Sequence, residues 1–569
     1  MFKKTTLLAA STALSLVAST SAFAADNNYA AAAINGNGAS SVANVLVQEL
    51  NCFGGPNNDL GFGNGTTATI PDHNYVPTSP TAGNPVYNCA TKSVQDLVNG
   101  HYISTGSGAG KNNWKGKVAT NGITTNPFGT WANIHYAFSD SPISASDLST
   151  YNSTAAPTTK AAIQIPMYVL PVAVAYAPAY GKIMTGTGVQ NLTFNVKVPH
   201  ADGTGGLRMK KATYCGIFNG TITNWNDAAL KADNGGQSLM STNDNLTRWN
   251  TTGVPIKLIG RNENSGTTNI FTRHLSAVCG GSVYNLGGQD QLPAGALSTA
   301  IYDKATGALT SGSEVAGKFG RVDGSDGIAH TVDVAIADPV AVGDVTLNGR
   351  LGYVGADWVA PSTLSGSTLH SADLQQGLTT SFKAATAVNA TLAFKGILPP
   401  QSLSTGKYDP ASTAVGQMPG VRTDPLAWVF PANATTGVAN PAFGYPIVGT
   451  TNMLLYTCYA SPAVRNAIQG FGMLHLGKVT IADDLTKVPA KLVTSTAKDA
   501  GGLMLGIDPR NGIAPLPASF TNAIVETFFT KVVSGNNPGG LNLWIQDKLQ
   551  KKSTDVLTGN STCSPGVGA

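Results

Sequence analysis

The sequence contains few charged residues for its length. Asp, Glu, Lys and Arg make up 12% of the 569 residues, against roughly 25% in ordinary soluble proteins. The formal net charge of +4 is too small for a protein that neutralises a row of nucleic-acid phosphates with basic side chains. Hydrophobic residues make up 42%, so the chain is able to bury a large core. The composition therefore excludes a disordered chain and argues against nucleic acid as a partner.

Long apolar runs and closely spaced metal ligands are also missing. After the N-terminal segment, no apolar run reaches the roughly 20 residues of a membrane helix, so no membrane anchor is expected. The histidines form no H-x-H or H-x-x-x-H pair and the cysteines no C-x-x-C pair, which predicts neither a metal site nor a cofactor. The cysteines are even in number, which favours disulfides in an oxidising compartment, and their spacing does not choose the pairing.

The N-terminal residues have the pattern of a secretory signal peptide. Lys3 and Lys4 are basic, the segment from Leu7 to Ala18 is apolar, and Ala22-Phe23-Ala24 matches a cleavage site. We therefore expect residues 1–24 to be removed and the mature chain to be periplasmic or secreted.

The remaining pattern is typical of an α/β protein. Apolar, β-branched runs at 163–176 and 445–456 predict buried strands. These two strands would suit two crossings of the chain between a pair of lobes. Helices are predicted at about 41–50, 271–279, 462–473 and 519–531. Polar stretches at about 53–90, 108–130, 232–253 and 362–442 are predicted to be long loops or insertions.

Four Gly/Ser/Thr-rich segments stand where predicted strands give way to predicted helices. Asn35 to Ser41 is suited to bind an anion at the start of a helix, or simply to cap that helix. Thr105 to Lys111 fails as a phosphate-binding Walker A loop, because Thr105 and Asn112 replace residues that such a loop requires.

The third segment, Phe138 to Pro142, and the fourth segment, Gly260 to Thr268, contain ionisable residues. Asp140 is placed to accept a proton from a protonated oxyanion or to cap the next helix, and the local pattern favours capping. Arg261 offers a planar fork for phosphate, or else forms a surface ion pair. Ser265 to Thr267 place hydroxyls and amides at a helix start, where the helix dipole favours an anion.

In this order, the four segments resemble the phosphate-binding proteins of bacterial phosphate ABC transporters, and more closely their DING subfamily, named for an Asp-Ile-Asn-Gly start. Here Ala33 stands in place of that Asp. The match continues through Tyr214-Cys215-Gly216-Ile217-Phe218-Asn219-Gly220, Thr223-Asn224-Trp225, Gly324-Ser325-Asp326-Gly327-Ile328, Gly352-Tyr353-Val354, Gly444-Tyr445-Pro446-Ile447, Thr451-Asn452 and Pro515-Leu516-Pro517.

The resemblance implies a phosphate site. Asp140 would accept the proton of the phosphate, and Ser41 stands where the family usually has a bulky apolar residue that contributes its backbone amide. The phosphate-binding residues carried over in this way are Ser40, Ser41, Ser107, Asp140, Arg261, Ser265, Gly266 and Thr267.

The resemblance also implies the two-lobed fold of class II periplasmic binding proteins, here with long polar insertions. Residues 25–175 and 445–569 would form lobe one and residues 176–444 lobe two, and the two lobes would close around the ligand. The implied disulfides are Cys215–Cys279 and Cys458–Cys563, and with them Cys52–Cys89 inside an insertion.

The function that the resemblance implies is high-affinity binding of inorganic phosphate by an exported monomer that is not an enzyme. A phosphate ABC transporter permease is a candidate partner, for uptake or scavenging. One alternative is a DING-type alkaline phosphatase, although the dispersed histidines give no metal-ligand cluster. A second alternative is a secreted adhesive or scavenging protein that is not coupled to a transporter.

Overall fold

The computed structural model describes residues 34–54, 62–63, 100–117, 133–159, 161–196, 206–280, 283–284, 287–359, 369–377, 380–400, 416–430, 438–459, 462–476, 508–529 and 546–547. The expected signal peptide, residues 1–24, lies outside this part of the chain.

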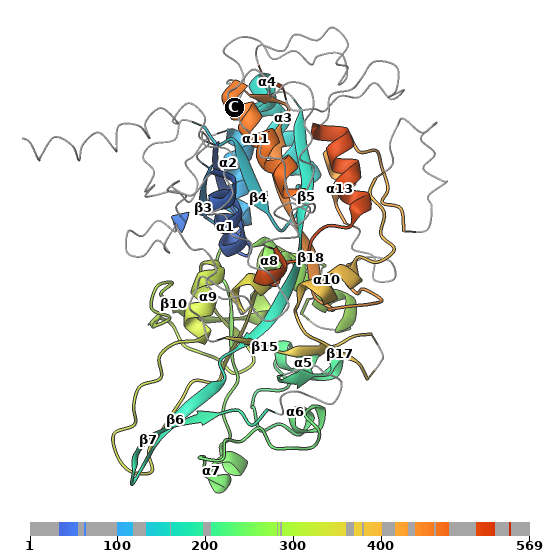
Figure 1. Cartoon of the computed structure of the whole chain (residues 1–569). Coiled ribbons are helices and arrows are strands. Elements are labelled where there is room, and N and C mark those ends of the chain that lie inside the picture. Colours follow the sequence, from blue (N-terminus) through green and yellow to red (C-terminus); the bar gives the residue numbers. More distant parts are fainter. Residues whose placement is uncertain are drawn as a thin grey trace, which may run out of the picture.

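One large mixed sheet runs through both halves of the molecule (Figure 1). Its strands, in spatial order, are β11 (Leu309–Ser311), β10 (Leu297–Tyr302), β12 (Phe319–Val322), β9 (Lys257–Arg261), β14 (Arg350–Gly355), β5 (Ala162–Tyr176), β18 (Val448–Tyr456), β4 (Tyr136–Ser139), β1 (Ile34–Gly38), β3 (Gly100–Ser104) and β2 (Phe62–Gly63), with β15 (His370–Ser371) beside β5.

Two long strands join the halves of this sheet. β5 is buried along its whole length, pairs antiparallel with β18 over its first part, and pairs antiparallel with β14 near its end. β18 in turn pairs antiparallel with β4. These strands confirm the predictions at 163–176 and 445–456, although β18 begins at Val448. Their β-branched and aromatic side chains suit positions that are covered on both faces of a sheet.

Each half of the sheet contains parallel strands. In one half β1 pairs parallel with β3 and with β4. In the other half β9 pairs parallel with β12 and with β14. Such strands end at a common edge, where the loops that follow them meet.

Helices cover the sheet in both halves (Figure 1). They are α1 (Ala43–Gly54), α2 (Ser107–Gly116), α3 (Ala145–Thr154), α4 (Ala156–Thr159), α5 (Lys211–Phe218), α6 (Ala228–Asp233), α7 (Leu246–Thr251), α8 (Gly266–Val278), α9 (Gly324–Val332), α10 (Ala387–Ala393), α11 (Pro462–His475) and α13 (Ala518–Ile524). Short helical turns are η3 (Ala294–Ala296), η4 (Ala356–Trp358), η6 (Pro425–Trp428), η9 (Asp508–Asn511) and η10 (Val525–Phe529). All the predicted helices are present, and α8 begins earlier than predicted.

Three small sheets complete the described part. They contain β13 (Val345–Leu347) with β6 (Ala179–Thr185) and β7 (Gly188–Thr193), β17 (Phe382–Lys383) with β16 (Asp373–Gln375) and β8 (Arg208–Met209), and β19 (Cys458–Tyr459) with β20 (Gln546–Asp547). The β6–β7 hairpin projects at the end of the molecule that lies farthest from α1 and α11 (Figure 1). Apolar side chains from both halves form one continuous core.

The stretches at 108–130, 232–253 and 362–442, predicted as loops or insertions, contain regular structure in their described parts, so the loop prediction is wrong there. Helix α2 lies at the start of the first stretch, α7 lies in the second, and α10 with β15, β16 and β17 lie in the third. Helix α2 is polar in sequence, but Trp114 is fully buried, stacks on Tyr151 at 4.5 Å between ring centroids and donates a hydrogen bond to the Leu455 carbonyl. Tertiary packing therefore forms a helix where local propensity predicts a loop.

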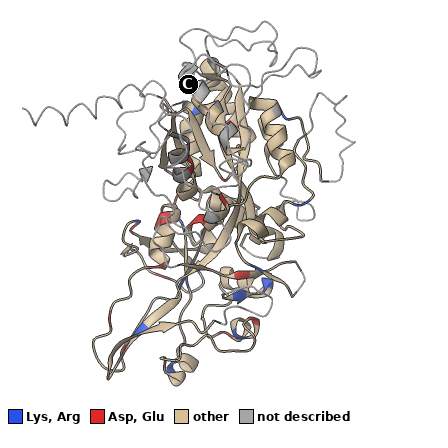
Figure 2. Cartoon of the chain, viewed as in Figure 1, with Lys and Arg blue, Asp and Glu red and all other residues tan. Residues whose placement is uncertain are grey.

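A disulfide joins Cys215 of α5 to Cys279 at the end of α8, the pair that the family resemblance implies. Cys458 is also disulfide-bonded, while Cys563, Cys89 and the side chain of Cys52 lie outside the described residues. Among the described helices, none is both long enough and apolar enough to cross a membrane. Charged residues are spread thinly along the ribbon (Figure 2).

Candidate functional site

The loops after β1, β3 and β4 meet at one edge of the sheet. The amide of Gly106 donates to the Gly38 carbonyl at 2.8 Å, and the amide of Ala39 donates to the Phe138 carbonyl at 2.9 Å. Gly38 has φ 134°, and a Cβ atom there would lie 2.0 Å from the Phe138 carbonyl oxygen. Only glycine permits this close packing of the loops.

Asp140 follows β4 and lies at the centre of the site, with 2% of its surface exposed. Three hydroxyl groups donate to its carboxylate. Ser41 and Thr267 donate to Oδ2 at 2.6 Å and 2.8 Å, and Thr451 donates to Oδ1 at 2.7 Å. The backbone amide of Asp140 donates to Oγ of Ser107 at 3.1 Å.

Burial raises the pKa of the Asp140 carboxyl group above its ordinary value. The three hydroxyl hydrogen bonds and the charge of Arg261 lower this pKa, but they offset only part of the effect of burial. Asp140 is thus a buried acceptor surrounded by neutral donors, and it is suited to accept a proton from an acidic ligand.

Arg261, at the end of β9, faces the loop after β1. Its guanidinium group donates to Oγ of Ser40 at 2.9 Å and to Oγ of Ser325 at 3.1 Å, and it forms an ion pair with Glu263. Burial lowers the pKa of the Arg261 guanidinium, but the Glu263 carboxylate outweighs burial and raises it. The residue is 3% exposed, so the ion pair that the sequence predicted as an alternative exists, but not at the surface.

Helix α8 points its N-terminus at the same place. Ser265 is the N-cap and accepts a hydrogen bond from the Thr268 amide at 3.2 Å. A Cβ atom on Gly266 would lie 2.2 Å from the Ser141 amide nitrogen and 2.6 Å from Oγ of Ser107. The helix dipole and the free amides of this first turn favour an anion.

The structure therefore brings all the predicted binding residues into one buried cluster. These residues are Ser40, Ser41, Ser107, Asp140, Arg261, Ser265, Gly266 and Thr267. The side chain of Ser41 contacts Asp140 directly, whereas the resemblance implied only a role for its amide.

The local pattern around Asp140 gave a wrong prediction. Helix α3 is capped by Ser144, whose side chain accepts from the Asp147 amide, while the Asp147 side chain accepts from the Ser144 amide. This capping box satisfies the helix start without Asp140, which turns inward to the hydroxyl groups.

Sequence reasoning did not assign Thr451, Ser325 and Glu263 to the site. Thr451 reaches Asp140 from 311 residues away, and Ser325 lies at the start of α9, so no local pattern connects either of them to it. Thr451 and Ser325 do lie in segments that carry the family resemblance, which was the available signal. Glu263 stands two residues after Arg261 in the fourth segment.

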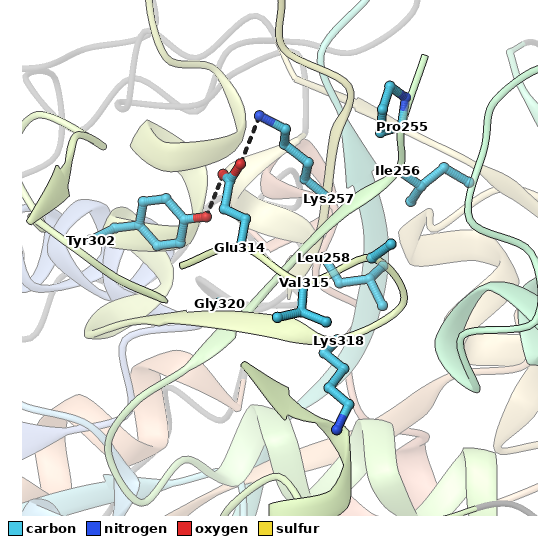
Figure 3. A pocket seen from close by; sticks show the side chains of 10 residues that line it. Pro255, Ile256, Lys257, Leu258, Tyr302, Glu314, Val315, Lys318 and Gly320 are labelled. Carbon is cyan, nitrogen blue, oxygen red and sulfur yellow. Dashed lines mark hydrogen bonds and ion pairs between the residues drawn. The ribbon is translucent and has the colours of Figure 1, made fainter. Parts of the chain in front are cut away.

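A separate pocket of about 160 Å³ lies beside β9, β10 and β12. Three of its polar side chains pair with one another (Figure 3): Glu314 accepts from Tyr302 at 2.6 Å and forms an ion pair with Lys257 at 2.7 Å, while Lys318 points away from them. This pocket contains none of the candidate site residues.

A family model of the PBP superfamily domain matches residues 18–411. The chain belongs to the PBP superfamily. This membership and the mixed α/β architecture confirm the predicted two-lobed fold.

Two relatives of this PBP-superfamily chain are similar over most of their length. "Alkaline phosphatase L" of Pseudomonas aeruginosa is 27% identical over 434 residues, which cover 76% of this chain and 82% of the relative. A "Phosphate-binding protein" of an unknown prokaryotic organism is 27% identical over 443 residues, which cover 75% and 88%. A solved "DING protein" is 21% identical with a TM-score of 0.50, and the match covers 90% of this chain and all of that one. These similarities confirm the predicted resemblance.

Proposed function

We propose that the protein is exported and binds inorganic phosphate between its two lobes. The observation that carries the proposal is the buried Asp140 carboxylate, which accepts from three hydroxyl groups and lies close to the Arg261 guanidinium. The guanidinium, hydroxyls and amides supply donors for the phosphate oxygens, and Asp140 accepts the proton that phosphate carries near neutral pH.

This arrangement selects phosphate over sulfate. Sulfate carries no proton at neutral pH, so its lone pairs would face the Asp140 carboxylate. A buried charge left without its donor costs about 1–3 kcal/mol or more. Discrimination then arises from a penalty on the wrong ligand rather than from extra contacts to the right one.

Binding closes the lobes in this proposal, with residues 25–175 and 445–569 in lobe one and residues 176–444 in lobe two. Two of the hydrogen bonds already described connect these segments, from Thr267 to Asp140 and from Arg261 to Ser40. A ligand that touches residues of both lobes stabilises the closed form because only that form offers all its contacts.

The relative named alkaline phosphatase makes phosphate-ester hydrolysis the alternative to test. In the described part of the site, Ser40 contacts Ser325 and Arg261, and neither of these is a general base. We therefore propose binding without catalysis, followed by delivery to a phosphate ABC transporter permease or by scavenging outside the cell.

The deciding experiment is calorimetry on phosphate-stripped mature chain with phosphate, arsenate and sulfate. We expect tight binding of phosphate and arsenate and at least 100-fold weaker binding of sulfate. The proposal fails if micromolar phosphate gives no heat. Turnover of a phosphate ester by metal-supplemented protein, abolished by Ser40→Ala, would instead establish a phosphatase.

A further inference from the structure

A second polar cluster lies in the core, outside the candidate phosphate site. Glu49 in α1, His475 at the end of α11 and Asp508 at the start of η9 are all fully buried. One ligand atom of each lies within 4.8 Å of those of the other two. Glu49 is eight residues beyond Ser41, inside the helix that follows it.

Hydrogen bonds from residues outside the cluster orient two of these side chains. Nε2 of His475 lies 2.9 Å from the Met167 carbonyl oxygen; a carbonyl only accepts, so Nε2 carries the proton. Nδ1 lies 2.8 Å from Oε1 of Glu49, a contact that requires a proton on one of the two atoms or a cation bound by both, while the Tyr168 hydroxyl donates to the other oxygen of Glu49. Metal-binding histidines and carboxylates are held in this way in proteins.

Asp508 lacks the partners that a buried carboxylate needs. Among the described residues, no N–H or O–H group donates a hydrogen bond to either oxygen, and the ion-pair partner of Glu49 is His475 of the same cluster. Two facing carboxylates in the core require a proton or a cation between them.

We propose that Glu49, His475 and Asp508 bind one divalent transition-metal ion, for which Zn²⁺ is the best-suited probe. One imidazole nitrogen with two carboxylate oxygens is a donor set that zinc accepts, whereas Ca²⁺ and Mg²⁺ prefer oxygen alone. The cation balances the two carboxylates and supplies the missing partner of Asp508. It also ties α1 to segments more than 400 residues later in the chain, so its role is structural.

The spacing rules that predicted no metal site do not apply to ligands so far apart in sequence.

The test is a titration of the EDTA-treated full mature chain with ZnCl₂ in phosphate-free buffer, followed by calorimetry, elemental analysis and thermal unfolding. We expect one Zn²⁺ per chain, weaker binding of Ca²⁺, and a rise in Tm of several degrees.

Asp508→Asn and His475→Gln should each weaken Zn²⁺ binding by about 100-fold or more. The matched control is His274→Gln. His274 is also buried, but it contacts the Tyr214 hydroxyl at 3.1 Å and the Ala439 carbonyl at 2.8 Å, away from any carboxylate ligand. This control should bind Zn²⁺ like the wild type.

The wild-type titration decides the proposal even where a variant fails to fold. Absence of stoichiometric Zn²⁺ binding would show that a shared proton holds the carboxylates together. Equal Zn²⁺ affinity in a folded Asp508→Asn protein would place the metal elsewhere.

Discussion

At the scale of single residues, the buried carboxyl group of Asp140 destabilises the folded protein when it ionises. The same group is the acceptor that the proposed binding of phosphate requires. Its folded-state pKa is raised above the ordinary value of 3.8, so the folded protein binds this proton more tightly than the unfolded chain does. Stability is therefore greatest below that value and falls as the pH rises and the buried carboxyl group ionises. Asp140→Asn removes the charge and, with it, this loss.

We therefore expect phosphate-free Asp140→Asn to have a higher Tm than the wild type at pH 8. The difference should vanish well below pH 3.8, where the wild-type carboxyl group is protonated in both states. Calorimetric unfolding of both proteins across this range measures it. A Tm difference that does not change with pH would show that Asp140 ionises without penalty.

The same substitution should weaken phosphate binding. Loss of a hydrogen bond to a charged acceptor costs about 1.5–3 kcal/mol, which corresponds to roughly 10- to 150-fold in affinity. Sulfate should lose less, because its clash with the carboxylate disappears, so the margin between the two anions narrows. Asp147→Asn, in the capping box of α3, is the matched control and should bind like the wild type in the same titration.

At the scale of elements, the approach of α8 to the Asp140 loop depends on Gly266. A Cβ atom at this position would overlap the Ser141 amide nitrogen and Oγ of Ser107, so Gly266→Ala should hold the N-terminus of α8 away from the Asp140 loop. We expect at least 100-fold weaker phosphate binding with little loss of Tm. Gly280→Ala, just after α8, meets no atom within 4 Å and is the control. Equal phosphate affinity in both variants would mean that α8 does not need to approach the Asp140 loop.

Sequence predicts best those elements whose own residues show how the element is buried or where it begins. β5 is apolar throughout because both of its faces are covered, and α8 carries its own N-cap, Ser265. Helix α2 is different, since Trp114 packs against Tyr151 and Leu455 from other elements. Its polar sequence alone predicts a loop.

At the scale of the whole molecule, the family resemblance pointed to site residues that lie in local motifs and missed contacts between distant segments. The resemblance pointed to residues that follow strand ends, because its four segments lie where β1, β3, β4 and β9 end. Contacts such as Thr451–Asp140 and His475–Glu49 arise only when β18 and α11 return to the N-terminal half of the sheet. These contacts follow from the topology of the sheet, which cannot be read from a short stretch of sequence.

That topology makes closure of the lobes a property of the whole chain. β5 and β18 connect the two halves, while the proposed ligand groups lie on both sides of them, so phosphate should shift the population from open to closed. Small-angle scattering should show a smaller radius of gyration with phosphate than without it, and phosphate at about 1,000 times its Kd should add about 4 kcal/mol of stability. Gly266→Ala should lose the phosphate-induced compaction and Gly280→Ala should keep it. If wild-type protein binds phosphate and its radius of gyration does not change, the lobes are already closed before the ligand binds.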